Sequence, residues 1–449
     1  MQVFFVRRRL MRVFVLWLAG GVAACSAPSA PTGTAPTAAP QQVLATAVIR
    51  AEPPALTPTA VVLQRPTTQP TAAATSTPAS AAATSAPAAP ASQAAEEIAP
   101  ELAAALQRSL DQIVSDGKIP GSVLAVHIPG YAVWTGASGF IDWQRSQPMT
   151  PSTPVRIASI SKVFTAAVVL QLVEEGRLDL DAPVSAWFPD LLPAGDRTTV
   201  RNLLNHTSGL YDYLEDKGYL ARAFERPEHR WAPEELVSYA AGQKLLFQPG
   251  QPGAWDYSST NYVLLGMVVE AVTGNRLAHE MRERIFIPLG LNDTYFAPDE
   301  EVHGRAARGY RHEHDYTEIS LSFAYATANL VSTVDDVQRF GEALFGGELL
   351  RPESLAAMQV FEDGKGQYNM PALEYGLGVM RNQLPVAADV PASAGTVLGH
   401  TGGFGGFRSA LWHAPASGVT IALAMNQGAT DPNILATYVF EAILEAQHP

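Results

Sequence analysis

The chain has 449 residues, of which 47% are hydrophobic, so it is long enough to bury one large core or two smaller ones. Its formal net charge of -13, from 43 acidic and 30 basic side chains, argues against the basic surface that nucleic-acid binding requires. The single cysteine, Cys25, excludes a disulfide within the chain and a zinc site built from cysteines.

The N-terminus has the layout of a secretory signal. Arginines at positions 7–9 and 12 precede an uncharged, mostly apolar run over residues 13–24, and Cys25 follows directly. This run is shorter than the roughly 20 apolar residues that a membrane-spanning helix needs. The stretch Val22-Ala23-Ala24-Cys25 resembles the lipobox of bacterial lipoproteins, in which cleavage precedes the cysteine and the sulfur carries diacylglycerol. We therefore expect a lipoprotein signal peptide over residues 1–24 and lipidation of Cys25, with an ordinary signal peptide and a chance cysteine as the alternative.

Residues 25–95 are dominated by Ala, Pro, Thr and Ser. Such a composition offers too few bulky apolar side chains to offset the entropy of ordering, and it predicts a disordered linker. Together with the N-terminus, it predicts an extracytoplasmic protein of the cell envelope, anchored in a membrane by lipid. Residues 96–449 contain no second linker of this kind, and we expect them to form one catalytic domain.

The domain begins with apolar residues at helical spacing, which predict a helix over residues 97–116. Two strands are expected next, over 122–128 and 131–137, joined by a turn at Pro129-Gly130.

The C-terminal part of the domain predicts three strands, over 397–400, 407–413 and 419–425, and a closing helix over 433–446. A long helix-rich segment separates these strands from the first two. Strands from both ends of a domain that flank inserted helices predict an α/β fold of the α+β type. We expect an antiparallel sheet of five or more strands flanked by helices, with an attached all-helical lobe.

A buried helix is expected over residues 158–170, which are apolar nearly all round. Ser159 and Lys162 stand three apart at its start, so they share a helix face and the amine can approach the serine oxygen. Burial favours the neutral form of a lysine, which can then act as a general base. The helix N-terminus adds partial positive charge beside the oxyanion that forms on attack. Alone, Ser-x-x-Lys is a weak signal, since it arises about once by chance in a chain of this length.

The segment Arg156-Ile157-Ala158-Ser159-Ile160-Ser161-Lys162-Val163-Phe164-Thr165-Ala166 resembles the active-site segment of a known family. That family joins penicillin-binding D-Ala-D-Ala carboxypeptidases, class C β-lactamases and related esterases, and the resemblance implies a β-lactamase/transpeptidase-like fold. Three further segments match the family in the same order. The first, Leu203-Leu204-Asn205-His206-Thr207-Ser208-Gly209-Leu210, resembles its "LLxHTSGL" signature. We expect His206 and the turn after it to brace the helical lobe.

The second segment, Tyr257-Ser258-Ser259-Thr260-Asn261-Tyr262, resembles the family's Tyr-x-Asn element and the helix that follows it. The resemblance gives Tyr257 a catalytic role in relaying a proton between the serine and the leaving group. Ser259 stands where the family has asparagine, and a hydroxyl cannot span two partners as a carboxamide does. A second register, with Asn261 as the amide, breaks the spacing to Tyr262.

The third segment, Gly399-His400-Thr401-Gly402-Gly403, resembles the family's Lys-Thr-Gly strand in the histidine form of its carboxypeptidase-like and esterase-like members. By resemblance, the backbone N–H groups of Ser159 and Gly403 form the oxyanion hole. Substrate binding is expected at Ser259, His400, Thr401 and Gly402, where the glycine lets a substrate backbone lie against the strand.

Other patterns are set aside or left open. The run His312-Glu313-His314-Asp315 lacks a third placed ligand and predicts a solvated loop, so no metal site is expected. There is no Gly-x-Ser-x-Gly elbow and no phosphate-binding glycine loop, and no cofactor is implied. Three tyrosines after the signature either line a substrate cleft or pack the lobe: Tyr211, Tyr213 and Tyr219.

These observations predict a serine hydrolase that forms an acyl-enzyme on Ser159 with Lys162 and Tyr257 moving the proton. The expected substrate is a small molecule or peptide, with a D-amino-acid peptide of cell-wall type preferred and D-Ala-D-Ala carboxypeptidase-like activity as its model. An esterase of small acyl groups or a β-lactamase is the nearest alternative. A non-catalytic protein that binds cell-wall fragments or β-lactams is the alternative from another class.

Overall fold

The computed structural model describes residues 95–386 and 390–447. The predicted signal peptide, the predicted lipidation site at Cys25 and almost all of the predicted linker lie outside these residues. Among the residues described, no helix combines the length and the apolar character that crossing a bilayer requires.

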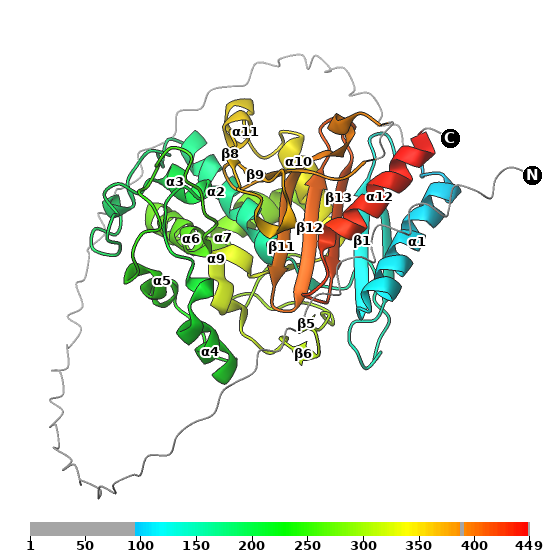
Figure 1. Ribbon diagram of the computed structural model, residues 1–449, viewed down its shortest axis with the longest axis horizontal. Helices are drawn as coiled ribbons and strands as arrows, with labels where there is room; N and C mark the ends of the chain where they lie inside the picture. The colour runs from blue at the N-terminus through cyan, green and yellow to red at the C-terminus, as the bar shows by residue number, and fades with distance from the viewer. Residues whose placement is uncertain (1–94, 387–389, 448–449) are drawn as a thin grey trace, which may run out of the picture. The chain divides into compact units, whose positions relative to one another are not determined.

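An antiparallel sheet forms one side of the molecule (Figure 1), and within the described residues it has eight strands in the order β2-β1-β13-β12-β11-β10-β9-β8. The strands from the two ends of the domain therefore meet in one sheet, where β1 pairs with β13. The bounds of the strands are β1 (Gly121–His127), β2 (Trp134–Gly139), β8 (Glu362–Asp363), β9 (Glu374–Tyr375), β10 (Met380–Gln383), β11 (Thr396–Phe404), β12 (Phe407–His413) and β13 (Thr420–Met425).

Helices cover both faces of this sheet. The terminal helices α1 (Pro100–Gly117) and α12 (Pro432–Gln447) lie side by side on one face (Figure 1), and α10 (Val334–Phe345) packs on the other. Successive side chains of β13 point alternately to these two layers of helices. Ile421, Leu423 and Met425 join the core beneath α1 and α12, whereas the smaller Ala422 and Ala424 join the core on the opposite face. Burying both faces explains why β13 is apolar at every position after Thr420.

The other side of the molecule is a helical lobe (Figure 1). The buried helix α2 (Ser161–Glu174) passes between the lobe and the sheet, and residues of both belong to one hydrophobic core. The remaining helices are α3 (Val200–Leu204), α4 (Lys217–Glu225), α5 (Pro233–Ala241), α6 (Ser259–Thr273), α7 (Leu277–Met281), α8 (Ile287–Leu289), α9 (Tyr325–Ala328) and α11 (Pro352–Met358).

Two smaller sheets complete the described fold. The first has the order β3-β7-β4, from β3 (Val155–Arg156), β7 (Leu330–Ser332) and β4 (Tyr295–Phe296). The second is the hairpin of β5 (Tyr310–Arg311) and β6 (His314–Asp315). The first matters for function because β3 leads directly into the segment that carries Ser159.

The predicted fold class is confirmed: a large antiparallel sheet is flanked by helices and carries a helical lobe. The predicted terminal helices and the strand over 407–413 match the structure closely. The strand predicted over 131–137 begins later, at Trp134, and the strand predicted over 397–400 continues to Phe404. That extension brings Thr401 and Gly403 into β11.

Candidate active site

Ser159 lies in a short 3-10 turn, Ala158–Ile160, between β3 and α2. The turn is held from both sides, because the Ile157 N–H donates to the carbonyl of Leu330 at 3.1 Å and the Ser161 hydroxyl donates to the carbonyl of Ala158 at 2.7 Å. Ala158 adopts a left-handed backbone conformation, with φ of 51°, which turns the chain sharply before the serine. Ser159 thus follows a rigid bend.

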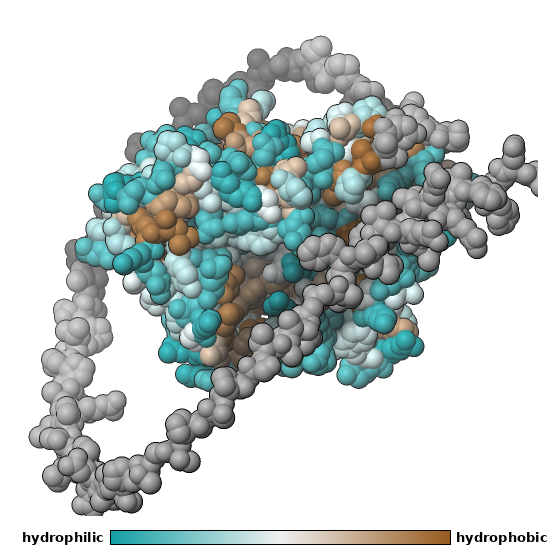
Figure 2. Space-filling model, viewed as in Figure 1, coloured by the Kyte–Doolittle hydropathy of each residue, from teal (hydrophilic) through white to brown (hydrophobic). Residues whose placement is uncertain are grey.

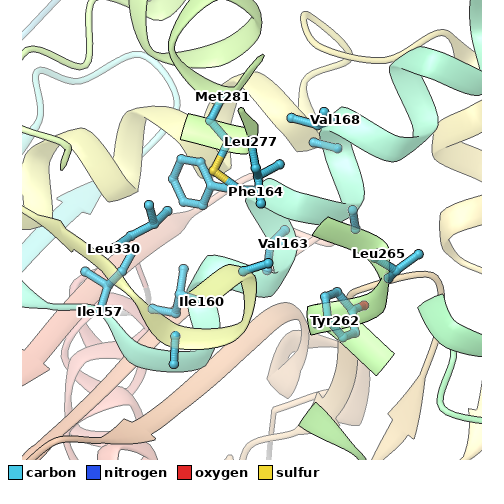
Figure 3. Close-up of a cluster of buried hydrophobic side chains, with 14 of the residues drawn as sticks. Ile157, Ile160, Val163, Phe164, Val168, Tyr262, Leu265, Leu277, Met281 and Leu330 are labelled. Carbon is cyan, nitrogen blue, oxygen red and sulfur yellow. The ribbon is translucent and has the colours of Figure 1, made fainter. Parts of the chain in front are cut away.

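Apolar side chains on either side of Ser159 anchor this bend in the core. Ile157, Ile160 and Val163 are buried. In Figure 3 Ile157 lies beside Leu330 of β7, and Ile160 and Val163 lie between Leu330 and Tyr262 of α6. The bend cannot shift without disturbing the close-packed side chains of β7 and α6 that surround it.

Lys162 is almost fully buried, and its Nζ atom donates to Ser159 Oγ at 3.2 Å and to the carbonyl of Thr327 at 3.2 Å. Burial lowers the pKa of Lys162 to about 7, and the nearby carboxylate of Asp212 acts in the opposite direction. A substantial neutral fraction therefore exists near neutral pH, and a neutral amine at this distance can accept the serine proton.

Tyr257 completes the group. It precedes α6, and its ring centroid lies 4.9 Å from Lys162 Nζ. Burial raises the pKa of Tyr257 well above its usual value, while an interaction of its hydroxyl with Ser159 lowers it. The structure thus brings together the three residues predicted to be catalytic, which are distant from one another in sequence.

His206 of the HTSGL signature holds the segment that carries Tyr257. Its Nδ1 atom accepts from the Ser258 N–H and pairs with the Asn261 side chain, both at 3.1 Å. Asn261 is itself fixed by the Ser208 hydroxyl, which donates to its Oδ1 at 2.7 Å. The predicted bracing role of His206 thus has a structural basis, and the bracing acts on Tyr257.

Ser259 and Asn261 occupy different environments. Ser259 lines the cleft above Ser159, at the first position of α6. The carboxamide of Asn261 is fully buried and engaged by His206 and Ser208. Of the two residues considered for the family's asparagine position, Ser259 therefore faces the cleft and Asn261 does not.

The strand β11 borders the cleft with an unpaired edge. β10 pairs with it only as far as Gly399, so residues 400–404 have no partner strand on that side among the residues described. Thr401 and Gly403 line the cleft together with Ser159. Gly402 faces the other way, because a Cβ atom there would lie 2.5 Å from the carbonyl oxygen of Ile157 and 3.0 Å from the Cβ of Ala158. Its lack of a side chain lets β11 approach the Ser159 turn.

His400 borders the cleft but has no exposed surface. Its Nε2 atom is 3.0 Å from the Tyr375 hydroxyl, and its Nδ1 atom bonds to the carbonyl of Thr401. Burial lowers the pKa of His400 to about 3, so the ring is neutral. Since both ring nitrogens are engaged, β11 offers a substrate the polar groups of Thr401 and Gly403 rather than the ring of His400.

The cleft has a volume of about 460 Å³ and contains charged groups that the sequence analysis missed. It is lined by three acidic residues, Asp212, Glu215 and Asp431. It is also lined by Arg408, which is paired with Gly403 in the β11-β12 hairpin. Burial raises the pKa of Asp212 to about 6, against the effect of hydrogen bonds from the backbone of Ser259 and Leu214. Asp212 lies six residues after His206 in the signature, and this proximity was the only signal in the sequence.

Two of the three tyrosines that follow the signature pack the helical lobe and do not line the cleft. Tyr213 and Tyr219 are fully buried, and both hydroxyls donate to the carbonyl of Phe323, so they pack the lobe. The run from His312 to Asp315 forms an exposed hairpin, and among the described residues no cluster of His, Cys, Asp or Glu could hold a metal ion.

Residues 106–444 match the family model described as Beta-lactamase. The chain belongs to the beta-lactamase family. Esterase EstB of Burkholderia gladioli is 30% identical over 372 residues, which are 73% of this chain and 91% of the esterase. The similarity therefore extends far beyond the segments around Ser159, Tyr257 and Gly403.

Two D-stereospecific hydrolases resemble this beta-lactamase family member in structure. The D-amino acid amidase from Ochrobactrum anthropi SV3, complexed with L-phenylalanine, matches with a TM-score of 0.69 and 32% identity over 77% of this chain and 99% of the amidase. A D-stereospecific amidohydrolase from Streptomyces matches with a TM-score of 0.65 and 34% identity over 76% of this chain and 97% of its own. The chain is accordingly an enzyme, a serine hydrolase of the beta-lactamase family.

Proposed function

We propose that this hydrolase cleaves amide bonds of D-amino-acid peptides or amides through an acyl-enzyme on Ser159. The observation that carries the proposal is the buried Lys162 amine, 3.2 Å from Ser159 Oγ at the floor of a cleft. The same arrangement supports catalytic roles for Ser159, Lys162 and Tyr257.

In the first step Ser159 Oγ attacks the carbonyl carbon of the substrate while neutral Lys162 takes the hydroxyl proton. The oxygen that becomes negative is stabilised by the backbone N–H groups of Ser159 and Gly403. Lys162 then returns this proton through the Tyr257 hydroxyl to the leaving nitrogen, the C–N bond breaks and the amine departs, which leaves an ester on Ser159. In the second step water attacks this ester and gives a proton to Lys162. The C–O bond to Ser159 then breaks, and the same proton returns to Ser159 Oγ while the acid product leaves and ionises.

Charged groups of the cleft support a zwitterionic or cationic substrate. The carboxylates of Asp212, Glu215 and Asp431 complement the ammonium group of an amino-acid amide or a peptide N-terminus. Arg408 can meet a carboxylate or carbonyl oxygen. The two solved relatives named above are D-specific by their names, and this is the basis for proposing D-configuration here.

Ester hydrolysis is the second candidate function. Ser259 at the cleft replaces an asparagine carboxamide, so one fewer hydrogen-bonding group is available to orient a substrate amide. An activated ester depends less on such orientation because its leaving group is better. The similarity to esterase EstB points the same way.

The test compares kcat/KM for D-phenylalanine amide, L-phenylalanine amide, a D-Ala-D-Ala peptide and p-nitrophenyl acetate, with Ser159→Ala as the control. The proposal predicts that a D-substrate is cleaved at least tenfold faster than its L-isomer, and that Ser159→Ala abolishes the activity. A protein that cleaves only the ester supports the second candidate. A protein that cleaves none of them, yet binds a fluorescent penicillin, is the non-catalytic binding protein considered above.

We also propose that the enzyme acts in the cell envelope on wall-type peptides, held there by lipid on Cys25. The support is the sequence alone, in which the only cysteine follows an arginine-flanked apolar run and small residues. Metabolic labelling with a clickable fatty acid in a bacterial host is expected to mark the wild type and not Cys25→Ser. Equal labelling of the two proteins would contradict the anchor.

A further inference from the structure

A second hollow adjoins the catalytic cleft, and its surface is largely apolar. It has a volume of about 330 Å³, within the range of small-ligand sites. Figure 2 shows apolar side chains gathered in a hollow between the surfaces of α4 and the β5-β6 hairpin. The side chains that give it this character are Leu214, Leu220, Phe224, Tyr316, Phe323 and Phe404.

The hollow is continuous with the cleft. Leu214, Gly403 and Arg408 line both, so a molecule seated at Ser159 can extend into the hollow without leaving the protein surface. Phe404 is the residue after Gly403 on the same strand. The passage between the two spaces therefore lies beside the proposed oxyanion donor.

The order of residues along β11 indicates which half of a substrate, the acyl half or the leaving half, would enter the hollow. If the reacting carbonyl sits at Gly403, Thr401 and Phe404 lie on opposite sides of it along the unpaired edge of the strand. For a peptide substrate, the Thr401 hydroxyl can donate a hydrogen bond to the carboxylate of the leaving half. The hollow beside Phe404 is consequently on the acyl side.

The walls of the hollow are firmly held on the inner side. Phe404 stacks on Phe323, with ring centroids 5.1 Å apart, and Phe323 stacks on the buried Tyr219 at 4.6 Å. The outer wall is an edge-to-face pair of Phe224 and Tyr316 at 5.3 Å. Phe224 is 52% exposed, so a substantial part of an aromatic ring faces solvent beside the cleft. Covering this surface with an apolar group would be favourable.

We propose that this hollow is the acyl-side specificity subsite, and that it takes an aromatic or large aliphatic side chain of the substrate. The inference rests on the proposed acyl-enzyme mechanism and adds the preferred class of acyl group. It makes Phe224, Leu220 and Phe404 specificity-determining residues, although none of them touches the reacting atoms.

The experiment uses substrate pairs that differ only in the acyl side chain: D-phenylalanine against D-alanine p-nitroanilide, and p-nitrophenyl phenylacetate against p-nitrophenyl acetate. Wild type is expected to favour the phenyl-bearing member of a pair by tenfold or more in kcat/KM. Phe224→Ala opens the outer wall and is expected to lower this ratio threefold or more. Leu220→Trp fills the hollow and is expected to lower this ratio further than Phe224→Ala does.

Tyr131→Ala is the matched control, because it removes an aromatic ring of 38% exposure that does not line the cleft or this hollow. A wild-type ratio near one, or ratios in Phe224→Ala and Leu220→Trp equal to that in Tyr131→Ala, would overturn the inference.

Calorimetric binding of D-phenylalanine amide to Ser159→Ala, with and without Phe224→Ala, separates the subsite from the proposed function. Tighter binding when Phe224 is present, together with a wild-type protein that cleaves none of the substrates, would contradict the proposed function and still support the subsite. Equal binding with and without Phe224, beside normal catalysis, would remove only the subsite.

Discussion

The ring of His206 lies on the ring of Tyr257, with centroids 4.2 Å apart and planes tilted by 32°. The same imidazole accepts the N–H of Ser258, the next residue, at 3.1 Å. His206 therefore fixes both the ring and the backbone at Tyr257. Burial lowers the pKa of His206 well below its usual value, so the imidazole stays neutral and keeps Nδ1 as an acceptor.

Replacing His206 with leucine is expected to lower kcat tenfold or more with little change in KM, because Tyr257 loses its support while the substrate-lining groups remain. The N–H of Ser258 and the Asn261 amide would lose their acceptor, which costs about 1 to 3 kcal/mol of stability for each buried donor. Steady-state kinetics and thermal melts at pH 7.5 check both effects. His279→Leu, at an exposed histidine on α7, is the control and should change neither quantity.

The pH dependence of kcat/KM reports the proton on Lys162. Because burial lowers its pKa to about 7 and the neutral amine is the reactive form, activity should rise with pH through an apparent pKa near 7. Asp212 opposes this shift, since its negative charge favours the protonated amine. Asp212→Asn should therefore move the rise toward lower pH. An unchanged or higher apparent pKa in this variant would contradict the assignment of the base.

Tyr257→Phe removes one hydroxyl and keeps the ring that stacks on His206. If that hydroxyl relays the proton, kcat should fall by about 10²- to 10⁴-fold while thermal stability stays close to wild type. Tyr438→Phe, on α12, is the matched control and should keep full activity. A Tyr257→Phe enzyme with more than half of wild-type kcat would remove Tyr257 from the mechanism.

Gly402→Ala tests the contact between β11 and the Ser159 turn. The added Cβ would lie 2.2 Å from Ser409 Oγ and 2.5 Å from the Ile157 carbonyl oxygen, so the strand or the turn must move. We expect a loss of about 1 to 3 kcal/mol in the free energy of unfolding and a fall in kcat. Gly242→Ala has open space around the new methyl group and should leave both unchanged. Denaturant titration and initial rates measure the two effects.

The features that sequence analysis predicted well have local signals. β12 was predicted at its observed bounds because Gly405-Gly406 precede it, Pro415 follows it, and most of the residues between them are apolar. The two-residue strands β8 and β9 have no period to detect, so the far edge of the sheet was missed. The sequence predicted Ser159, Lys162 and Tyr257 because four segments resemble the motifs of one family and occur in the same order. Each motif alone is too weak a signal.

The residues that sequence analysis missed depend on contacts between distant segments. Asp212 approaches Lys162 only because the loop after the signature is held against the start of α6, where Thr260 bonds to the backbone of Tyr211 and Tyr213. Tyr375 meets His400 only through the pairing of β9, β10 and β11. Arg408 faces the cleft because of the register that places it opposite Gly403. Such registers cannot be deduced from one strand's own pattern.

Fluorophosphonate labelling followed by peptide mass spectrometry measures whether Ser159 is the nucleophile and Lys162 its base. We expect a single adduct on Ser159, formed faster as pH rises through 7 and greatly slowed in Lys162→Ala, since the buried amine activates the hydroxyl. An unmodified Ser159, or labelling at the same rate when Lys162 is replaced, would contradict the claim that this serine is the nucleophile and this lysine its base.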